Sequence, residues 1–185
     1  MNARPLILVA ALLAAGCSGS TGAARPEQRF VTVKVPIDPA DAPQTGIVRS
    51  GHQLFQPLAG RCGIVGVTGS HAEFLPKRPL CHLRVRITAD DATAHTIALG
   101  DQKLVLADGT LVGLSPDAMH VKRQPTEVVL GARNAAEVDL WWEPPVGATV
   151  RAVLLVGDHD VEVQGTTTNP ATNRDGVRFP LRAFS

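Results

Sequence analysis

The stretch Cys81–Thr88, with the sequence Cys-His-Leu-Arg-Val-Arg-Ile-Thr, constrains the fold of this chain more than any other segment. Its apolar residues alternate with polar ones, a period of two that is typical of a β-strand with one face in a core and the other in water. Cys81 lies in phase with the apolar residues, so we expect its sulfur to point into the core. Arg84 and Arg86, on the opposite face, are predicted to be solvated.

Seven to nine short β-strands are predicted in the chain, and we identify no amphipathic helix outside the leader. The strongest turn signal is Ala107-Asp108-Gly109-Thr110, because Asp-Gly between apolar runs favours a tight hairpin turn with positive φ. The pattern predicts an all-β fold, an antiparallel sandwich of immunoglobulin-like architecture. The expected strands lie within 29–35, 47–58 (a weak edge strand), 61–68, 81–88, 103–112 (a hairpin), 126–130, 136–143, 149–156 and 161–163.

The N-terminus has the features of a bacterial lipoprotein signal. Met1–Arg4 carries one positive charge, and Leu6–Ala15 is an apolar run too short to span a bilayer as a helix. The run ends in Ala14-Ala15-Gly16-Cys17, which resembles a lipobox with Ala14 where Leu is usual. Cys17 is therefore the predicted lipidation site, and the alternative is an ordinary secretory signal with an incidental cysteine. Two acyl chains on this cysteine would give stable anchoring.

The domain organisation follows from this leader. Residues 1–16 form the predicted signal peptide and residues 17–28, rich in Ser, Gly, Ala and Thr, a flexible tether. The β-sandwich is expected over 29–165. Residues 166–185 are interpreted as a polar linker followed by an apolar segment, Val177–Phe184, that docks on the sandwich. The expected location is the extracytoplasmic face of the bacterial cell membrane.

Cys62 and Cys81 are the two cysteines that remain once Cys17 is assigned to the anchor. Outside the cytoplasm a pair of cysteines is most simply a disulfide. The alternative is two buried free thiols. A redox-active pair is disfavoured because the chain has no Cys-x-x-Cys motif.

Five segments carry a family resemblance: Leu-Arg-Val-Arg-Ile-Thr (83–88), the hairpin 104–112, Glu-Val-Val-Leu-Gly (127–131), Glu-Val-Asp-Leu-Trp-Trp-Glu-Pro-Pro (137–145) and Val-Arg-Ala-Val-Leu-Leu (150–155). Their order resembles the telokin-like, immunoglobulin-like domain of unknown function in bacterial surface lipoproteins and secreted antigens. Ala89-Asp90-Asp91 replaces the usual Asn-Gly-like turn, and Leu111 stands where an aromatic residue is common. The resemblance implies a fold and a location, and it brings no catalytic residues.

The histidines are scattered along the chain, and no two have the spacing of a zinc motif. They are interpreted as isolated surface residues, so neither a metal site nor a cofactor is predicted. The motif Asp158-His159-Asp160 places two carboxylates beside an imidazole, and is interpreted as a polar turn rather than a cation site. No nucleophile elbow or phosphate-binding loop is present, and the chain is not expected to be an enzyme. The histidines are His52, His71, His82, His95, His120 and His159.

Trp141 and Trp142 lie next to each other on a predicted strand. Alternation places Trp142 in the core and Trp141 on the opposite face. An exposed Trp141 would be a candidate contact for a partner. The preferred alternative is that the C-terminal segment covers it, with Phe179 or Phe184 against the ring.

Charge and composition narrow the function classes. Lys plus Arg number 18 against 17 Asp plus Glu, and this near-neutral balance argues against nucleic acid as a partner. The leading hypothesis is a non-enzymatic cell-envelope lipoprotein, whose domain is a binding or interaction module for an envelope protein or small ligand. The alternative is a metal-binding or small-ligand-carrying lipoprotein in which the fold groups the histidines. A third hypothesis is a hydrolase assembled from distant loops.

Overall fold

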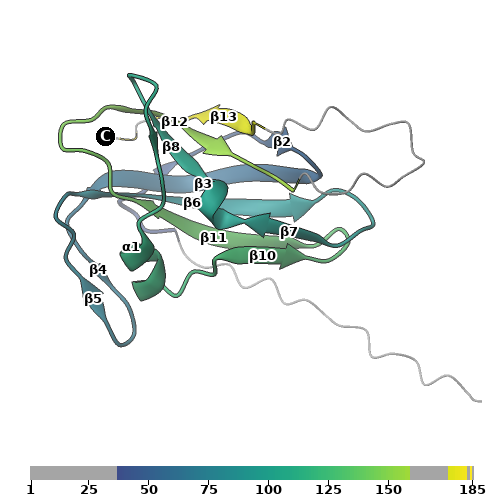
Figure 1. Ribbon diagram of the computed structural model, residues 1–185, viewed down its shortest axis with the longest axis horizontal. Helices are drawn as coiled ribbons and strands as arrows, with labels where there is room; N and C mark the ends of the chain where they lie inside the picture. Colours follow the sequence, from purple (N-terminus) through teal and green to yellow (C-terminus); the bar gives the residue numbers. More distant parts are fainter. Residues whose placement is uncertain (1–36, 159–174, 183, 185) are drawn as a thin grey trace, which may run out of the picture. The chain divides into compact units, whose positions relative to one another are not determined.

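Antiparallel β-sheets make up most of the protein in a computed structural model that describes residues 37–158, 175–182 and 184 (Figure 1). The described residues belong to one compact unit, Pro36–Ser185. This architecture confirms the predicted all-β class. The lipidation site Cys17, the signal peptide, the tether, and the strands expected at 29–35 and 161–163 lie outside the described residues.

The largest sheet is built around the predicted strand at 81–88, which extends over Leu80–Ala89 as β6. On one side β6 pairs with β3 and on the other with β11, both antiparallel. Because β6 is central, its apolar residues are fully buried, and Cys81 is only 1% exposed, as its phase predicts. The other strands of this sheet are β1 (Ala42–Pro43), β2 (Val48–Ser50), β3 (Gln53–Ile64) and β11 (Ala135–Trp142).

Strand β3 differs from the sequence prediction, which divided it between a weak strand in 47–58 and a separate strand in 61–68. It runs without a break over Gln53–Ile64, with two register shifts against β6. Gly60 has a specific role in this strand, because a Cβ there would lie 2.2 Å from the carbonyl oxygen of His82. Gly60 therefore permits a close approach of the β3 and β6 backbones within one continuous strand.

The second sheet contains β8 (Lys103–Leu106), β9 (Leu111–Val112), β12 (Val150–Leu155) and β13 (Val177–Pro180). Strands β8 and β9 form the predicted hairpin, and Gly109 has the expected positive φ of 88°. Strand β13 pairs with β12, so the C-terminal segment docks on the domain as predicted. Its Phe179 and Phe184 are buried in the core.

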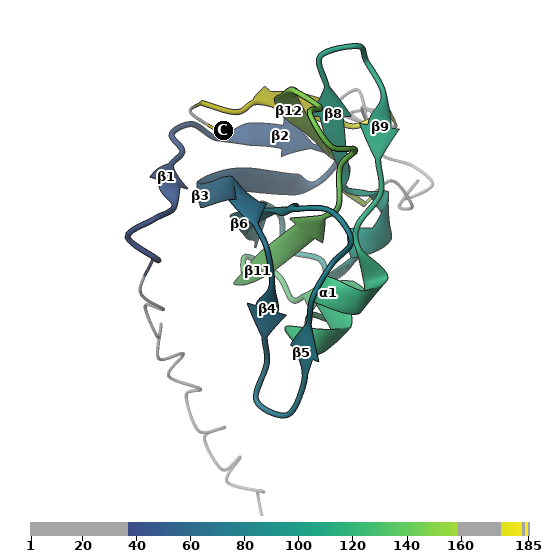
Figure 2. The ribbon, with the colours of Figure 1, turned by 90° about the vertical axis from the view of Figure 1, so that its left-hand side faces the viewer.

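Two short strand pairs and two helical turns complete the described part of the chain. The 3-10 turn η1 and the helix α1 were not predicted, since six residues are too few to show a helical period. Ser115 caps α1 by accepting a hydrogen bond from the Ala118 N–H, and Pro116 begins the helix. Figure 2 shows α1 beside the β4–β5 hairpin. These elements are β4 (Val67–Thr68), β5 (Glu73–Phe74), β7 (His95–Ala98), β10 (Glu127–Leu130), η1 (Leu99–Asp101) and α1 (Pro116–Val121).

One hydrophobic core joins the two larger sheets. It contains Trp142, which is fully buried as its phase predicts, together with Leu83 of β6 and Val153 of β12. The predicted disulfide between Cys62 and Cys81 links β3 to β6 beside this core. Among the described residues, no helix has the length and apolar character needed to span a bilayer.

Candidate functional site

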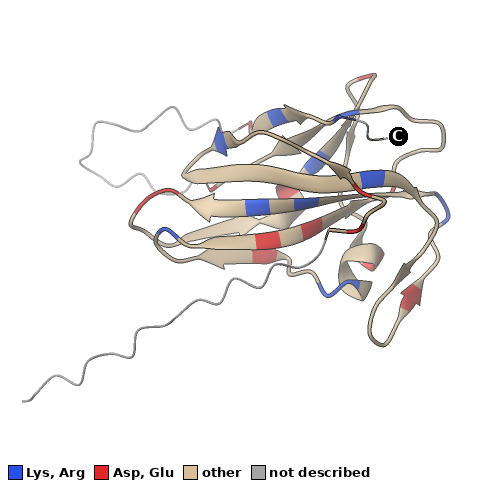
Figure 3. Ribbon diagram, turned by 180° about the vertical axis from the view of Figure 1, so that it is seen from behind, with Lys and Arg blue, Asp and Glu red and all other residues tan. Residues whose placement is uncertain are grey.

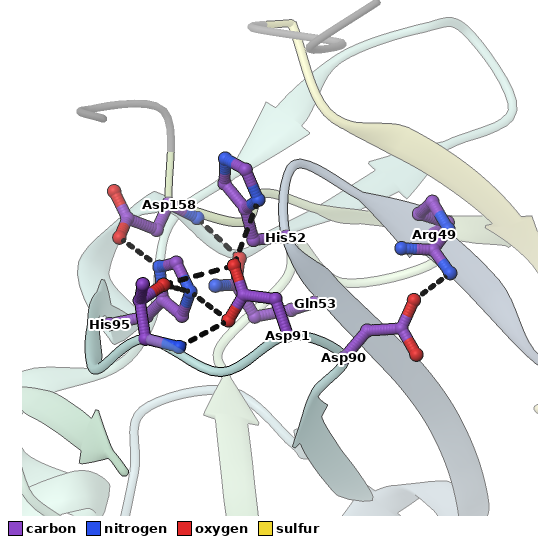
Figure 4. A network of polar contacts seen from close by, with 8 residues as sticks. Arg49, His52, Gln53, Asp90, Asp91, His95 and Asp158 are labelled. Carbon is purple, nitrogen blue, oxygen red and sulfur yellow. Dashed lines mark hydrogen bonds and ion pairs between the residues drawn. The ribbon is translucent and has the colours of Figure 1, made fainter. Parts of the chain in front are cut away.

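A cluster of histidine and aspartate side chains lies where four separate segments of the chain meet (Figure 4). His52 lies in the turn between β2 and β3, and Asp91 follows the end of β6. His95 begins β7, and Asp158 follows β12. Because β3 and β6 are antiparallel neighbours, the start of one and the end of the other meet at the same edge of the sheet. We call these four residues the His–Asp cluster.

His95 is the centre of the His–Asp cluster, and its side chain has no exposed surface. Its Nδ1 lies 2.8 Å from Asp158 Oδ2, and its Nε2 lies 2.7 Å from Asp91 Oδ1. Burial alone would lower the pKa of His95, but the hydrogen bonds to Asp91 and Asp158 raise it above its ordinary value. Each ring nitrogen of His95 therefore faces one carboxylate oxygen.

His52 and Asp91 form the solvent-facing side of the cluster. His52 Nδ1 lies 3.3 Å from Asp91 Oδ2, and the His52 ring stacks on His95 with centroids 4.9 Å apart. Burial acts to raise the pKa of Asp91, but hydrogen bonds from His95 and from the Thr93 N–H and hydroxyl lower it to about 2. Asp91 is consequently an ionised carboxylate over the neutral pH range.

The position of Asp158 is fixed by tight backbone packing against the turn between β2 and β3. The Gly157 N–H donates to Ser50 Oγ at 3.0 Å, and the Asp158 N–H donates to Gln53 Oε1 at 2.6 Å. A Cβ on Gly51 would lie 2.3 Å from the Asp158 carbonyl oxygen, so only glycine permits this approach. These contacts hold the end of β12 against the start of β3. As a result, the Asp158 carboxylate lies next to His95.

Gln53 contributes an unusual buried group to the same place. The residue is completely buried, and its Oε1 accepts the hydrogen bond from Asp158. Its Nε2 is also buried and has no hydrogen-bond partner. The Asp158 N–H fixes the orientation of the amide, because exchanging oxygen and nitrogen would place two donors against each other. Figure 4 shows the amide nitrogen on the side facing His95 and Asp91.

The cluster contradicts the interpretation of the histidines as isolated surface residues. His52 and His95 lie in contact, and His82 and His95 are buried. His71 and His120 are exposed, as expected, while His159 lies outside the described residues. Of the motif at 158–160 only Asp158 lies within the described residues, and it binds His95 from a distant segment. The sequence shows that Asp158 is adjacent to His159. The contact of Asp158 with His95 arises only from the pairing of distant strands.

One set of contacts resembles a catalytic triad. In it Thr93 would be the nucleophile, His95 the base and Asp158 the acid that orients the base. Thr93 Oγ1 lies 2.9 Å from His95 Nε2, whose Nδ1 faces Asp158. However, the same Nε2 faces the Asp91 carboxylate, and the raised pKa of His95 favours an imidazolium that has no lone pair to accept a proton. The His95 side chain has no exposed surface of its own, and His52 and Asp91 lie between it and solvent. The Nε2 of His95 is therefore shared between the Thr93 hydroxyl and the Asp91 carboxylate.

A second polar network covers Trp141 on the outer face of the large sheet, and corrects the prediction for this residue. Trp141 is only 6% exposed, so it is not available as a partner contact. Its ring stacks on His82 at 4.3 Å, and Lys122 lies over it at 5.5 Å. The contacts on the ring come from His82 and Lys122. Phe179 instead lies on β13 beside β12, and Phe184 lies beside Gly60 of β3.

His82 and Arg84 in turn bind Asp139, at 3.0 and 2.8 Å. Arg84 and Arg86 are therefore paired rather than simply solvated, and the partner of Arg86 is Glu137. Figure 3 shows basic and acidic residues on neighbouring strands of this sheet. The basic and acidic side chains of this network pair with one another, and His82 covers the Trp141 ring. We therefore interpret the network as structural.

Comparison with known proteins gives a likeness in fold. No family model and no curated protein matches the chain. The crystal structure of the yjhA protein from Bacillus subtilis is similar, with a TM-score of 0.50 and 11% sequence identity, over 75% of this chain and 96% of that one. At this identity the likeness supports the all-β fold and carries no residue roles.

Proposed function

We propose that this chain is a lipid-anchored protein of the bacterial cell envelope, and that its domain is a non-enzymatic binding module of immunoglobulin-like architecture. The apolar leader ending in Ala14-Ala15-Gly16-Cys17 supports the anchor, and the Cys62–Cys81 disulfide is consistent with an oxidising compartment. The resemblance of the strand order to surface lipoprotein domains supports the architecture. Under this proposal the partner is an envelope protein or a small ligand.

The observation that carries the binding role is the His–Asp cluster. It brings ionisable side chains from four segments to one edge of the domain, and its geometry favours a charged imidazole over a catalytic base. A cluster whose ionisable groups are oriented by contacts with one another can bind a ligand without changing it.

Acylation at Cys17 tests the anchor. The full-length protein is expressed in a bacterium that is supplied with labelled palmitate. The label and the membrane association are expected in the wild type and lost in Cys17→Ser. The double variant Cys62→Ala/Cys81→Ala is the matched control, because it removes the other cysteines and keeps the lipobox. A wild-type protein that carries no label would refute the anchor.

The second candidate function is metal binding or the carrying of a small ligand. The same cluster favours it, because His52, Asp91 and His95 each offer one ligand atom and these atoms lie within 4.8 Å of one another. Among the described residues, the exposed His71 and His120 lie outside this group. Calorimetric titration with divalent metal ions tests this function directly.

A further inference from the structure

We propose that His52, Asp91 and His95 bind one divalent transition-metal ion of the zinc class, with Nδ1 of His52, a carboxylate oxygen of Asp91 and Nε2 of His95 as its ligands. This inference deepens the second candidate function and rests on it, and it is independent of the lipid anchor. It assigns the ion class and the role of each residue.

The donor atoms select the class of ion. Two imidazole nitrogens and one carboxylate oxygen suit zinc, cobalt, nickel or copper, whereas calcium and magnesium prefer oxygen ligands throughout. Three protein ligands with one open position are typical of exchangeable or catalytic zinc sites rather than closed structural ones. The site therefore has the composition of a transition-metal site that also holds a water molecule.

The distances require only small movements. Asp91 lies 2.7 Å from His95 Nε2 and 3.3 Å from His52 Nδ1. Ligands about 2.0–2.1 Å from a tetrahedral ion are separated from one another by roughly 3.3 Å. The distances between the three side chains are already close to this value. To admit the ion, the distance between Asp91 and His95 Nε2 must increase by only about 0.6 Å. The proton on His95 Nε2 leaves to solvent, and the nitrogen lone pair takes its place on the metal.

Asp158 provides the outer support that a metal-binding histidine needs. Its carboxylate lies 2.8 Å from His95 Nδ1, the nitrogen that does not face the proposed ion. A carboxylate in this position fixes the tautomer that leaves Nε2 free for the metal and increases its basicity. Asp91 is supported in a similar way, since the Thr93 N–H and hydroxyl donate to its two oxygens at 3.1 and 3.0 Å.

Gln53 supplies an independent observation that points to a missing ligand. Its buried Nε2 donates to nothing, although its Oε1 is firmly held by Asp158. A buried donor without a partner costs about 1–3 kcal/mol, and native proteins rarely leave one unexplained. The amide faces the cluster, where a water molecule bound to the metal would provide the oxygen acceptor that it lacks.

The test titrates the full-length protein in detergent with zinc chloride, and with cobalt chloride as a visible probe. We expect one ion per chain and a cobalt spectrum typical of mixed nitrogen and oxygen ligands. His52→Ala is expected to weaken zinc binding at least tenfold, and this variant keeps the buried part of the cluster intact. Asp158→Asn is expected to weaken binding by about 10–100-fold, as for other outer-shell partners of a metal-bound histidine.

His71→Ala is the matched control, because His71 is an exposed histidine outside the cluster. The affinity of this variant for zinc should equal that of the wild type. Calcium chloride should give no heat of binding. Zinc binding that His52→Ala and Asp91→Asn leave unchanged would overturn the site while keeping a metal-binding function. An absence of binding of both zinc and cobalt would overturn the site and the metal-binding function, and the proposal of a lipid anchor would be unaffected.

Discussion

Two histidines in the described part of the chain each have their ring between two carboxylates. His95 lies between Asp91 and Asp158, and His82 lies 3.0 Å from Asp139 and 3.6 Å from Asp41. Each ring also stacks on a neighbouring ring. Burying a polar ring is costly unless its nitrogens are paired, so these carboxylates are required where the rings leave water.

Asp139 gives a prediction for the acid range. Burial would raise its pKa, but hydrogen bonds from His82 and Arg84 lower it to about 2, below the ordinary 3.8. Because the folded pKa is the lower one, this stabilisation is complete above 3.8 and is lost as the pH falls toward 2. Asp139→Asn is therefore expected to reduce the free energy of unfolding by up to roughly 2 kcal/mol at neutral pH.

Denaturant unfolding of wild type and Asp139→Asn between neutral pH and pH 2 measures this effect. The two proteins should converge at the acid end of the series. Glu73→Gln on β5, an exposed carboxylate outside this network, is the control and should stay within about 0.5 kcal/mol of the wild type. A difference for Asp139→Asn that stays constant over the whole series would contradict the ion-pair explanation.

At the scale of elements, β3 and β6 form the central strand pair of the largest sheet. Their pairing places His52 and Asp91 at one edge of the sheet, and the disulfide joins Cys62 to Cys81 toward the other end of β3. At Gly60 the two backbones lie so close that an added Cβ would be 2.2 Å from the carbonyl oxygen of His82. The alternation in β6 is visible in the sequence, whereas the close approach at Gly60 arises from the pairing of the two strands.

Gly60→Ala tests this approach. The added Cβ would lie 2.2 Å from the carbonyl oxygen of His82 and 2.8 Å from the Phe184 ring, so one of the strands must shift. We expect a loss of about 3 kcal/mol in the free energy of unfolding, a value typical of overpacking in a core. Gly100→Ala is the control, because a Cβ there meets no heavy atom within 4 Å. Equal effects of the two substitutions in thermal unfolding would show that backbone proximity is not the cause.

At the scale of the whole molecule, the core depends on a segment from the C-terminal end of the chain. Strand β13 pairs with β12, and its Phe179 is only 5% exposed within the core that both larger sheets share. The chain thus closes its core with residues that lie beyond the predicted limit of the sandwich at residue 165.

Phe179→Ala is expected to lower the free energy of unfolding by about 3 kcal/mol, because it removes a buried aromatic ring and leaves a cavity. Arg178→Ala changes the exposed neighbour on the same strand and should cost no more than about 0.5 kcal/mol. Both are measured by urea unfolding. Similar stability of Phe179→Ala and Arg178→Ala would mean that β13 contributes little to the core.

The sequence by itself determined the all-β class, the central strand at 81–88, the hairpin at Asp108-Gly109 and the pairing of Cys62 with Cys81. These depend on side-chain alternation, on local turn chemistry and on the small number of cysteines, which are properties that neighbouring residues reveal. The tertiary structure decided the rest. His52, Asp91, His95 and Asp158 come from four segments, and only the pairing of antiparallel strands brings them together. The burial of Trp141 was likewise decided across strands, since the residues that cover it are remote in the sequence.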